Sequence, residues 1–423
     1  MSYFILADCN NFYVSCERLF NPKIEKRPVI ALSQNDGCVI ARSQEAKLLG
    51  IKMGEPYFKV KNLCQHSNVV VFSSNYQLYA DISERVMNVL SQATPDFEIY
   101  SIDEAFLKFQ DHISENEILQ ESFALKKLVM QWVGIPISIG IGPTKTLAKV
   151  ANSLAKKNRE VGVFSLNSPQ IRENVLKKFP IEDVWGIGSK LSKRLNGIGV
   201  YSASDFVQKD PYHIRKIMGV VGERILLELQ GIACLNLEIP SPKKSISYTR
   251  SFGKKITDYS ELAEALATFT NKASIKLRKQ NGYTSAIQVF VETLTYERER
   301  TYRQQYGMIK PFSKATNDTV LLIKAAKDCL ERLFKPNEKY NRGGVIFLDL
   351  ASEETFVPDL FLGDIDSKRN LAMRTVDALN ARFGKNTVFF GAMGVNQTWK
   401  SRSEMKSSHN TTSWNHLPVV YAK

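Results

Sequence analysis

Two adjacent carboxylates, Asp103 and Glu104, interrupt an apolar, strand-like run that extends from Ile99 to Leu107. In an extended strand, neighbouring side chains point to opposite faces of the sheet, so these two acids could not bind one ion together. If the run instead folds back at residues 102–104 as the tip of a hairpin, both carboxylates can converge. An isolated Asp-Glu pair is more often a solvated turn, and the run by itself leaves both interpretations open.

A third acid near the N-terminus favours the functional interpretation of this pair. Residues 3–7 are apolar and predict a buried strand, which ends on Asp8. A carboxylate at the end of a buried strand is held rigidly while the tip of the strand stays open, and this arrangement suits chemistry. We therefore expect Asp8, Asp103 and Glu104 to contribute to one acidic site.

The composition limits the class of protein. The 423 residues are enough for two to four domains, and the net charge of +14 favours a polyanionic partner such as nucleic acid over a merely basic, soluble surface. The six cysteines are irregularly spaced without a CxxC pair, which predicts free thiols in a reducing compartment. The sequence shows no N-terminal signal and no apolar run near the roughly 20 residues of a membrane span, so we expect a cytoplasmic protein without a membrane association.

Five short blocks, at 8–17, 37–43, 72–76, 101–104 and 184–188, together resemble those of Y-family (translesion) DNA polymerases. The first and fourth blocks carry Asp8, Asp103 and Glu104 and resemble the catalytic pair of blocks of that family. The other three resemble the UmuC-like members, which include the catalytic subunit of bacterial DNA polymerase V and its plasmid-borne homologues. The resemblance extends over nearly the whole chain.

The resemblance implies an α+β fold, a right-hand polymerase with palm, fingers and thumb plus a C-terminal little-finger domain. The expected domains are a catalytic palm at 1–19 and 76–170, fingers at 20–75, a thumb with a helix-hairpin-helix at 171–242, a DNA-binding little finger at 243–352, and a partner-binding tail at 353–423. In the palm we expect a mostly antiparallel sheet with helices on one face. Residues 243–352 contain 20 Lys and Arg against 11 Asp and Glu, a net charge of +9, which favours contact with a DNA backbone.

Local patterns predict the individual elements. An Asn-Asp-Gly turn signal at 35–37 predicts a hairpin between two short strands. Strands are expected at 3–8, 28–32, 38–41, 135–142, 246–252, 286–294 and 344–350, and helices at 10–18, 42–49, 79–90, 144–157, 260–279, 318–334 and 369–383. The segment 399–423 is rich in Ser, Asn and Thr, and we expect it to become ordered only on a partner.

The activity implied by the resemblance is template-directed, error-prone DNA synthesis across lesions in the SOS response to DNA damage. Two Mg²⁺ ions would be bridged by Asp8 and Asp103, with the Cys9 carbonyl as a further ligand and Glu104 nearer the primer 3′-hydroxyl. Oxygen ligands of this kind suit Mg²⁺. The substrates would be primer-template DNA and dNTP.

The same resemblance implies the nucleotide-binding residues. Tyr13 would be the steric gate that excludes a 2′-hydroxyl, and Phe12 would pack in the core beside it. Further expected contacts are Ile40 and Ala41 over the nascent base pair, Lys47 on the triphosphate and Lys156 on the β- and γ-phosphates. Gln44 stands where many members carry a tyrosine, which weakens that contact. From the pattern alone, Tyr13 could be an ordinary core aromatic, Gln44 and Lys47 a solvated helix face, and Lys145, Lys149, Lys156 and Lys157 surface charge.

Two further motifs are expected to bind partners. Gly186 and Gly188 would open a helix-hairpin-helix in which Lys190 and Lys193 bind a DNA backbone. The same residues are also compatible with an ordinary helix cap. Leu360 and Phe361, in the segment 357–361, resemble the peptide that docks on the sliding clamp, and a linker with two buried apolar residues is the alternative. The resemblance also implies a UmuD′-type accessory dimer and RecA as partners.

Two other functions are compatible with the residues. A catalytically inactive DNA-binding scaffold could keep the polymerase shape, although the three carboxylates and Tyr13 argue against it. A metal-dependent nuclease or cyclase could use carboxylate-bound metals in the same way.

Overall fold

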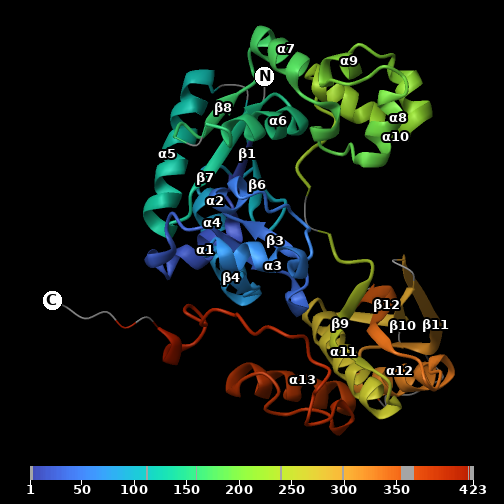
Figure 1. The fold of residues 1–423 in the computed structure, drawn as a ribbon. Coiled ribbons are helices and arrows are strands. Elements are labelled where there is room, and N and C mark those ends of the chain that lie inside the picture. The colour runs from blue at the N-terminus through green and yellow to red at the C-terminus, as the bar shows by residue number, and fades with distance from the viewer. Residues whose placement is uncertain are drawn as a thin grey trace. The chain divides into compact units, whose positions relative to one another are not determined.

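The computed structural model describes residues 3–110, 113–158, 160–238, 241–297, 300–353, 366–417 and 419. The chain divides into two units, whose elements are labelled in Figure 1. Unit 1 comprises Met1–Ser33, Gly37–Ile239 and Met405–Lys423, and unit 2 comprises Gln34–Asp36 and Pro240–Glu404. The chain therefore leaves unit 1 for unit 2 and returns to unit 1 near its C-terminal end.

A five-stranded sheet forms the centre of unit 1 and carries the acidic hairpin. Its strands lie in the order β5 (Phe97–Ile99), β6 (Glu104–Phe109), β1 (Tyr3–Cys9), β7 (Ile137–Gly142) and β8 (Val163–Ser165). All neighbours are antiparallel except β7 and β8. The fold-back between β5 and β6 confirms the hairpin, because the Tyr100 and Ser101 N–H groups donate to the Glu104 carbonyl at 3.0 and 3.1 Å.

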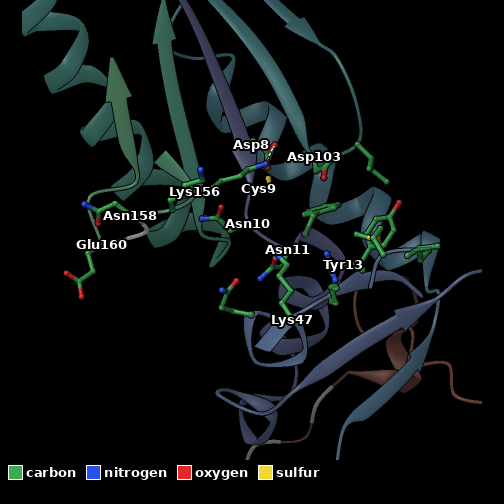
Figure 2. Close-up of a pocket in the computed structure, with 18 residues that line it drawn as sticks. Asp8, Cys9, Asn10, Asn11, Tyr13, Lys47, Asp103, Lys156, Asn158 and Glu160 are labelled. Carbon is green, nitrogen blue, oxygen red and sulfur yellow. Dashed lines mark hydrogen bonds and ion pairs between the residues drawn. The ribbon is translucent and has the colours of Figure 1, made fainter. Parts of the chain in front are cut away.

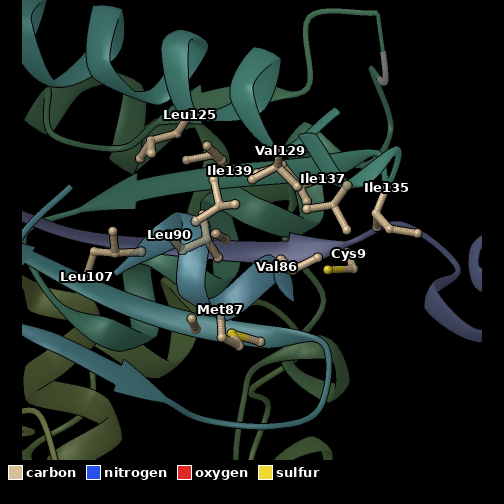
Figure 3. Close-up of a cluster of buried hydrophobic side chains, with 14 of the residues drawn as sticks. Cys9, Val86, Met87, Leu90, Leu107, Leu125, Val129, Ile135, Ile137 and Ile139 are labelled. Atoms are coloured by element: carbon tan, nitrogen blue, oxygen red, sulfur yellow. The ribbon is translucent and has the colours of Figure 1, made fainter. Parts of the chain in front are cut away.

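Helices cover both faces of this sheet, so the expectation of helices on one face was wrong. On one face, α4 (Tyr76–Leu90) and α5 (Glu115–Val133) pack on the sheet through the apolar cluster of Figure 3. On the other face lies α6 (Lys145–Ala155), whose Ala148 packs with Phe4 and Phe106. Glycine makes this second layer possible: a Cβ at Gly140 would lie 2.1 Å from the Asn152 backbone nitrogen.

Two smaller groups of elements complete unit 1. A three-stranded sheet has the order β3 (Val39–Arg42), β2 (Val29–Leu32), β4 (Val70–Ser73). The helices that precede these strands or lie between them in the sequence are α1 (Phe12–Leu19), α2 (Gln44–Leu48) and α3 (Tyr57–His66). The antiparallel pairing of β2 with β3 confirms the predicted hairpin, and Asn35 and Asp36 take positive φ angles of 62° and 50° in its turn. A separate apolar core holds the helices α7 (Pro169–Lys178), α8 (Ser189–Asn196), α9 (Ala203–Val207) and α10 (Pro211–Gln230).

Unit 2 contains a four-stranded antiparallel sheet with helices packed on it. The strand order is β11 (Arg300–Thr316), β10 (Gly282–Glu297), β12 (Tyr340–Ser352) and β9 (Ile246–Ile256). The helices α11 (Tyr259–Lys279) and α12 (Thr319–Leu333) pack on this sheet, and α13 (Asp366–Phe383) is joined to α11 by the Asp377–Arg278 ion pair at 2.7 Å. The strand β11 was not predicted. It lies at the edge of the sheet, and residues 302–305 are exposed, so it lacks the apolar alternation of a half-buried strand.

The C-terminal segment packs on its own chain at two places, contrary to the expectation that 399–423 needs a partner to become ordered. In unit 2, Trp399 is 5% exposed and its ring meets Phe269 edge to face at 5.4 Å. In unit 1, the Ser73 N–H donates to the Met405 carbonyl at 3.0 Å, and the Asn75 side-chain amide donates to the Ser407 hydroxyl at 2.9 Å. Residues 405–407 thus extend the edge of the three-stranded sheet beside β4.

All six cysteines are free thiols. Within the described ranges, no helix is both long enough and apolar enough to cross a membrane.

Candidate active site

A cavity of about 1020 Å³ in unit 1 collects most of the residues that the sequence marked as catalytic or nucleotide-binding (Figure 2). It lies where β1 passes into α1, opposite β3 and α2. The residues that line it include Asp8, Cys9, Phe12, Tyr13, Ile40, Ala41, Gln44, Lys47, Asp103 and Lys156. Glu104 does not line the cavity, although it lies directly opposite Asp8 in the β1–β6 pairing.

Asp8 is a buried carboxylate paired with a lysine. It is 4% exposed, and the Lys156 ammonium donates to its Oδ2. Burial raises the pKa of the Asp8 carboxyl to about 7; the Lys156 cation opposes this rise, and repulsion from Glu104 adds to it. The site therefore concentrates negative charge that a cation would stabilise.

The turn that presents Asp103 is held by Ser101. The Ser101 hydroxyl donates to Asp103 Oδ1 at 2.6 Å and accepts the N–H groups of Asp103 and Glu104 at 3.2 and 3.1 Å. The Cys9 N–H donates to the Asp103 carbonyl at 2.9 Å, which joins the hairpin tip to the end of β1. Asp103 is consequently fixed beside Asp8 and Cys9 at the cavity wall.

Glu104 points to a lysine that sequence reasoning had grouped with surface charge. The Lys149 ammonium lies 3.1 Å from both Glu104 carboxylate oxygens, and the two side chains are 14% and 20% exposed. Lys145 is also buried, in an ion pair with Glu98 at 2.5 Å. The surface-charge interpretation is thus wrong for Lys145 and Lys149. Their spacing with Lys156, at i, i+4 and i+11, already placed all three on one helical face.

The acidic residues fit a divalent metal ion by donor type. Their carboxylate oxygens are the ligands that Mg²⁺ prefers, and the raised pKa of Asp8 reflects a buried carboxylate whose charge a cation would stabilise. As placed, the described residues contain no group of three or more His, Cys, Asp and Glu side chains that converges on one point. The reason is visible in the ion pairs, because Lys156 and Lys149 hold Asp8 and Glu104.

Tyr13 lies at the cavity with its ring supported from behind. It stacks on Tyr79 with ring centroids 4.3 Å apart and 12° between the planes, and the Tyr79 hydroxyl donates to Glu17 at 2.7 Å. Burial raises the pKa of Tyr13 to about 12, so its hydroxyl stays protonated. Phe12 is 3% exposed and packs in the core, as expected.

The predicted phosphate-binding residues share this cavity with others that the sequence did not indicate. The Lys47 ammonium donates to Asn11 Oδ1 at 3.1 Å, and Asn11 itself takes the left-handed conformation that turns β1 into α1. Further lining residues that sequence reasoning missed are Arg42, Met53, Lys157, Asn158 and Glu160. Of these, Arg42 lay in the block at 37–43, and Lys157 was one of four lysines on a predicted helix.

The predicted helix-hairpin-helix turn lies outside this cavity. Gly186 has φ 89°, and a Cβ there would lie 2.8 Å from Ile225 Cδ1, so this position requires glycine. Gly188 precedes α8, and its carbonyl accepts the N–H groups of Leu191 and Ser192. Lys190 and Lys193 are exposed on this helix. The predicted clamp-binding residues Leu360 and Phe361 lie outside the described residues.

Family models match four parts of the chain. They are the impB/mucB/samB family at residues 7–153, its helix-hairpin-helix motif at 171–200, its C-terminal domain at 243–360, and a domain of unknown function, DUF4113, at 372–420.

Curated relatives match over the full length. The chain is 40% identical to the protein UmuC of Salmonella typhimurium, over 98% of this chain and 99% of that protein. It is 37% identical to the protein ImpB of Salmonella typhimurium, over 99% of each. DNA polymerase IV of Oceanobacillus iheyensis is 27% identical, over 90% of this chain and 89% of that protein.

Solved structures show the same fold. A Y-family DNA polymerase chimera built on Dbh superposes with a TM-score of 0.67 at 24% identity, covering 83% of this chain and all of that one. An insertion ternary complex of Dbh DNA polymerase superposes with a TM-score of 0.56 at 23% identity, with the same coverage. The fold, the site and the relatives together define a Y-family translesion DNA polymerase. Within that class, the chain belongs to the impB/mucB/samB family, of which UmuC is a relative.

Proposed function

We propose that this polymerase performs error-prone synthesis across DNA lesions in the SOS response, by nucleotidyl transfer with two Mg²⁺ ions. The observation that carries the proposal is the cavity of about 1020 Å³, which brings Asp8 and Asp103 together with Tyr13, Lys47 and Lys156. Carboxylates, an aromatic wall and lysines are what a magnesium-bound deoxynucleoside triphosphate needs from a protein. Polymerases of this family generally use a divalent metal ion.

The acidic residues would hold the metal ions. Asp8 and Asp103 would hold the two ions, with the Cys9 carbonyl as a further ligand, and Glu104 would complete the site nearer the primer 3′-hydroxyl. When bound, the ions lower the pKa of that hydroxyl and neutralise the charge of the triphosphate and the leaving pyrophosphate. Because Lys156 already pairs with Asp8, it can pass to the β- and γ-phosphates when a nucleotide enters.

Nucleotide selection would rest on shape. Tyr13 lies under the sugar, and its stacking on Tyr79 keeps the ring from yielding to a 2′-hydroxyl. Ile40 and Ala41 cover the nascent base pair. A small, loose cover tolerates a damaged template and checks base-pair shape poorly, which supports the error-prone assignment.

The remaining parts would bind DNA and partner proteins. In this proposal residues 1–19 and 76–170 are the palm, 20–75 the fingers, 171–242 the thumb and 243–352 the little finger. Gly186, Gly188, Lys190 and Lys193 grip the DNA backbone. By likeness to UmuC, a UmuD′-type dimer and RecA assist the enzyme, and Leu360 and Phe361 dock on the sliding clamp.

Primer extension across an abasic template site tests the proposal. The purified chain is assayed alone, and then with a UmuD′-type dimer and activated RecA, each time beside Asp103→Ala. Lesion bypass that needs the partners and is lost in the variant supports the full proposal, whereas bypass by the chain alone contradicts the partner assignment. Loss of labelled DNA ends without dNTP incorporation would indicate a nuclease, and DNA binding without either reaction would indicate an inactive scaffold.

A further inference from the structure

The Lys149 ammonium lies in an aromatic cage behind the acidic site. It is 4.3 Å from the ring centroid of Tyr100, 5.2 Å from that of Trp185 and 5.7 Å from that of Phe106. The Trp185 indole N–H donates to the Tyr100 hydroxyl at 3.2 Å, and these two rings meet edge to face. An ammonium within about 6 Å of an aromatic face is attracted by the ring quadrupole, and the attraction strengthens when the cation is shielded from water.

Both partners of the Lys149–Glu104 ion pair are shielded and converge from different elements. Lys149 is on α6, Glu104 begins β6, Tyr100 lies in the β5–β6 turn, and Trp185 precedes α8. The ammonium is equidistant, at 3.1 Å, from both carboxylate oxygens of Glu104. Lys149 therefore already partly neutralises both Glu104 oxygens, and a metal ion that binds Glu104 has to compete with this ammonium.

The cage gives the ammonium a second place to remain. If Glu104 turns to a metal ion, the rings of Tyr100 and Trp185 still stabilise the cation left behind. Trp185 also immediately precedes Gly186, the glycine that makes the turn into α8. One aromatic side chain thus connects the lysine behind Glu104 to the turn that is proposed to grip DNA.

We propose that Lys149 is a positioning residue that competes with the catalytic metal for Glu104, and that the cage of Tyr100, Phe106 and Trp185 holds its ammonium when the carboxylate turns to the metal. The proposal rests on the proposed role of Glu104 as a metal ligand. Its consequence is a pair of opposite effects. Without the lysine charge, the metal binds Glu104 more easily but the carboxylate loses its orientation. Without the indole, the ammonium stays on Glu104 and the metal binds less easily.

Metal binding and turnover, measured separately on the full chain with primer-template DNA, test the competition. The concentration of free Mn²⁺, measured by electron paramagnetic resonance without dNTP, gives the Mn²⁺ affinity. Single-turnover incorporation of dNTP gives the rate of the reaction. Lys149→Met keeps the apolar stem, and we expect it to bind Mn²⁺ 3- to 10-fold more tightly while incorporation slows at least tenfold. Trp185→Leu should bind Mn²⁺ 2- to 5-fold more weakly, and Lys149→Arg should restore most of the rate.

Controls separate this proposal from the one on which it rests. Lys127→Met removes an exposed lysine from α5 and should change neither quantity. If Glu104→Gln leaves Mn²⁺ affinity unchanged, the metal role of Glu104 is wrong and the present proposal falls with it. If Glu104→Gln weakens binding but Lys149→Met loses affinity and rate together, or behaves like the wild type, only the positioning role is wrong.

A second measurement does not depend on the Lys149 variants folding. The emission of Trp185 is obtained as the difference between the wild type and Trp185→Phe. Addition of Mg²⁺ should change this emission, because the ammonium then interacts with the cage instead of Glu104. A Trp185 emission that Mg²⁺ leaves unchanged, in a chain that binds the ion, would overturn the proposal.

Discussion

Asp8 is a carboxylate whose environment departs strongly from that of a carboxylate in water. It is buried, it faces Glu104 across the strand pair, and its pKa is raised to about 7 from an ordinary value near 3.8. A raised carboxyl pKa means that the folded chain holds the proton more tightly than the unfolded chain. Between about pH 4 and pH 7, the metal-free protein therefore loses stability as the pH rises.

Replacing Asp8 with Asn should remove this pH-dependent cost. We expect Asp8→Asn to be more stable than the wild type in EDTA at pH 8, by on the order of 2 kcal/mol, against an upper bound of about 4 kcal/mol for a shift of this size. The difference should shrink as the pH falls and vanish near pH 4, where both states are protonated. Urea denaturation at several pH values measures it, and a pH-independent difference would contradict the role of Asp8 ionisation.

Tyr13 carries a prediction about sugar selection. Tyr13→Ala removes the ring that stacks on Tyr79, and we expect rNTP incorporation relative to dNTP to rise by about 10- to 100-fold. Tyr13→Phe keeps the ring and should keep the selection. Tyr76→Ala is the control and should also keep it, because Tyr76 is an edge-on neighbour of Tyr13 that does not line the cavity. Ratios of kcat/KM for matched nucleotides provide the measurement, and an unchanged ratio in Tyr13→Ala would contradict the gate.

Sequence reasoning located the acids better than their counter-charges. The position of Asp8 could be predicted because an apolar strand ends on it. The positions of Asp103 and Glu104 could be predicted because their carboxylates converge only if the apolar run folds back at them. Lys149 was missed because a lysine on an amphipathic helix is usually solvated, and its burial depends on Trp185 from a distant segment. The spacing of Lys149 with Lys145 and Lys156 placed it on one helical face, but which partners that face meets is set by tertiary packing.

At the scale of elements, glycine decides how closely α6 approaches the sheet. The structure places this helix directly on β7, and the sequence predicted both elements but not their contact. The edge strand β11 escaped prediction for a different reason, since an exposed strand has no apolar period to detect. A buried element can be predicted because burial leaves an apolar period in the sequence. The close packing of two elements depends instead on positions without a side chain, such as Gly140, and these leave no such period.

Gly140→Ala tests the close approach of α6. Its Cβ would meet the backbone of Asn152 at 2.1 Å and that of Ala148 at 2.2 Å, so we expect a loss of about 2–4 kcal/mol in the free energy of unfolding. Gly188→Ala is the matched control, because a Cβ there meets nothing within 4 Å and its φ is −86°. Chemical denaturation compares the two, and equal stabilities would contradict this account of the packing.

At the scale of the whole molecule, the C-terminal segment contributes residues to both units. Trp399 belongs to the core of unit 2, and Met405, six residues later, packs with the core of the three-stranded sheet in unit 1. Residues 405–407 are thus structural in unit 1, within a segment that is also a candidate for partner binding.

Removal of residues 405–423 should weaken the edge of that sheet. The Ser73 amide loses its acceptor, the Met405 carbonyl, and we expect its hydrogen exchange to accelerate at least tenfold while amides of β1 are unaffected. Met405→Ala, which keeps the backbone acceptor, should leave the Ser73 amide more protected than the truncation does. Protection of Ser73 that survives truncation would show that the segment does not pair with β4.

The central claim is that Asp8, Asp103 and Glu104 form the metal-dependent catalytic site of a DNA polymerase. Incorporation of a single dNTP on an undamaged primer-template in Mg²⁺, assayed with the partners present, compares the wild type with Asp103→Ala at equal DNA occupancy. We predict that the variant binds DNA with near wild-type affinity but incorporates more slowly by on the order of 10³-fold. Incorporation at the wild-type rate by Asp103→Ala would contradict the account.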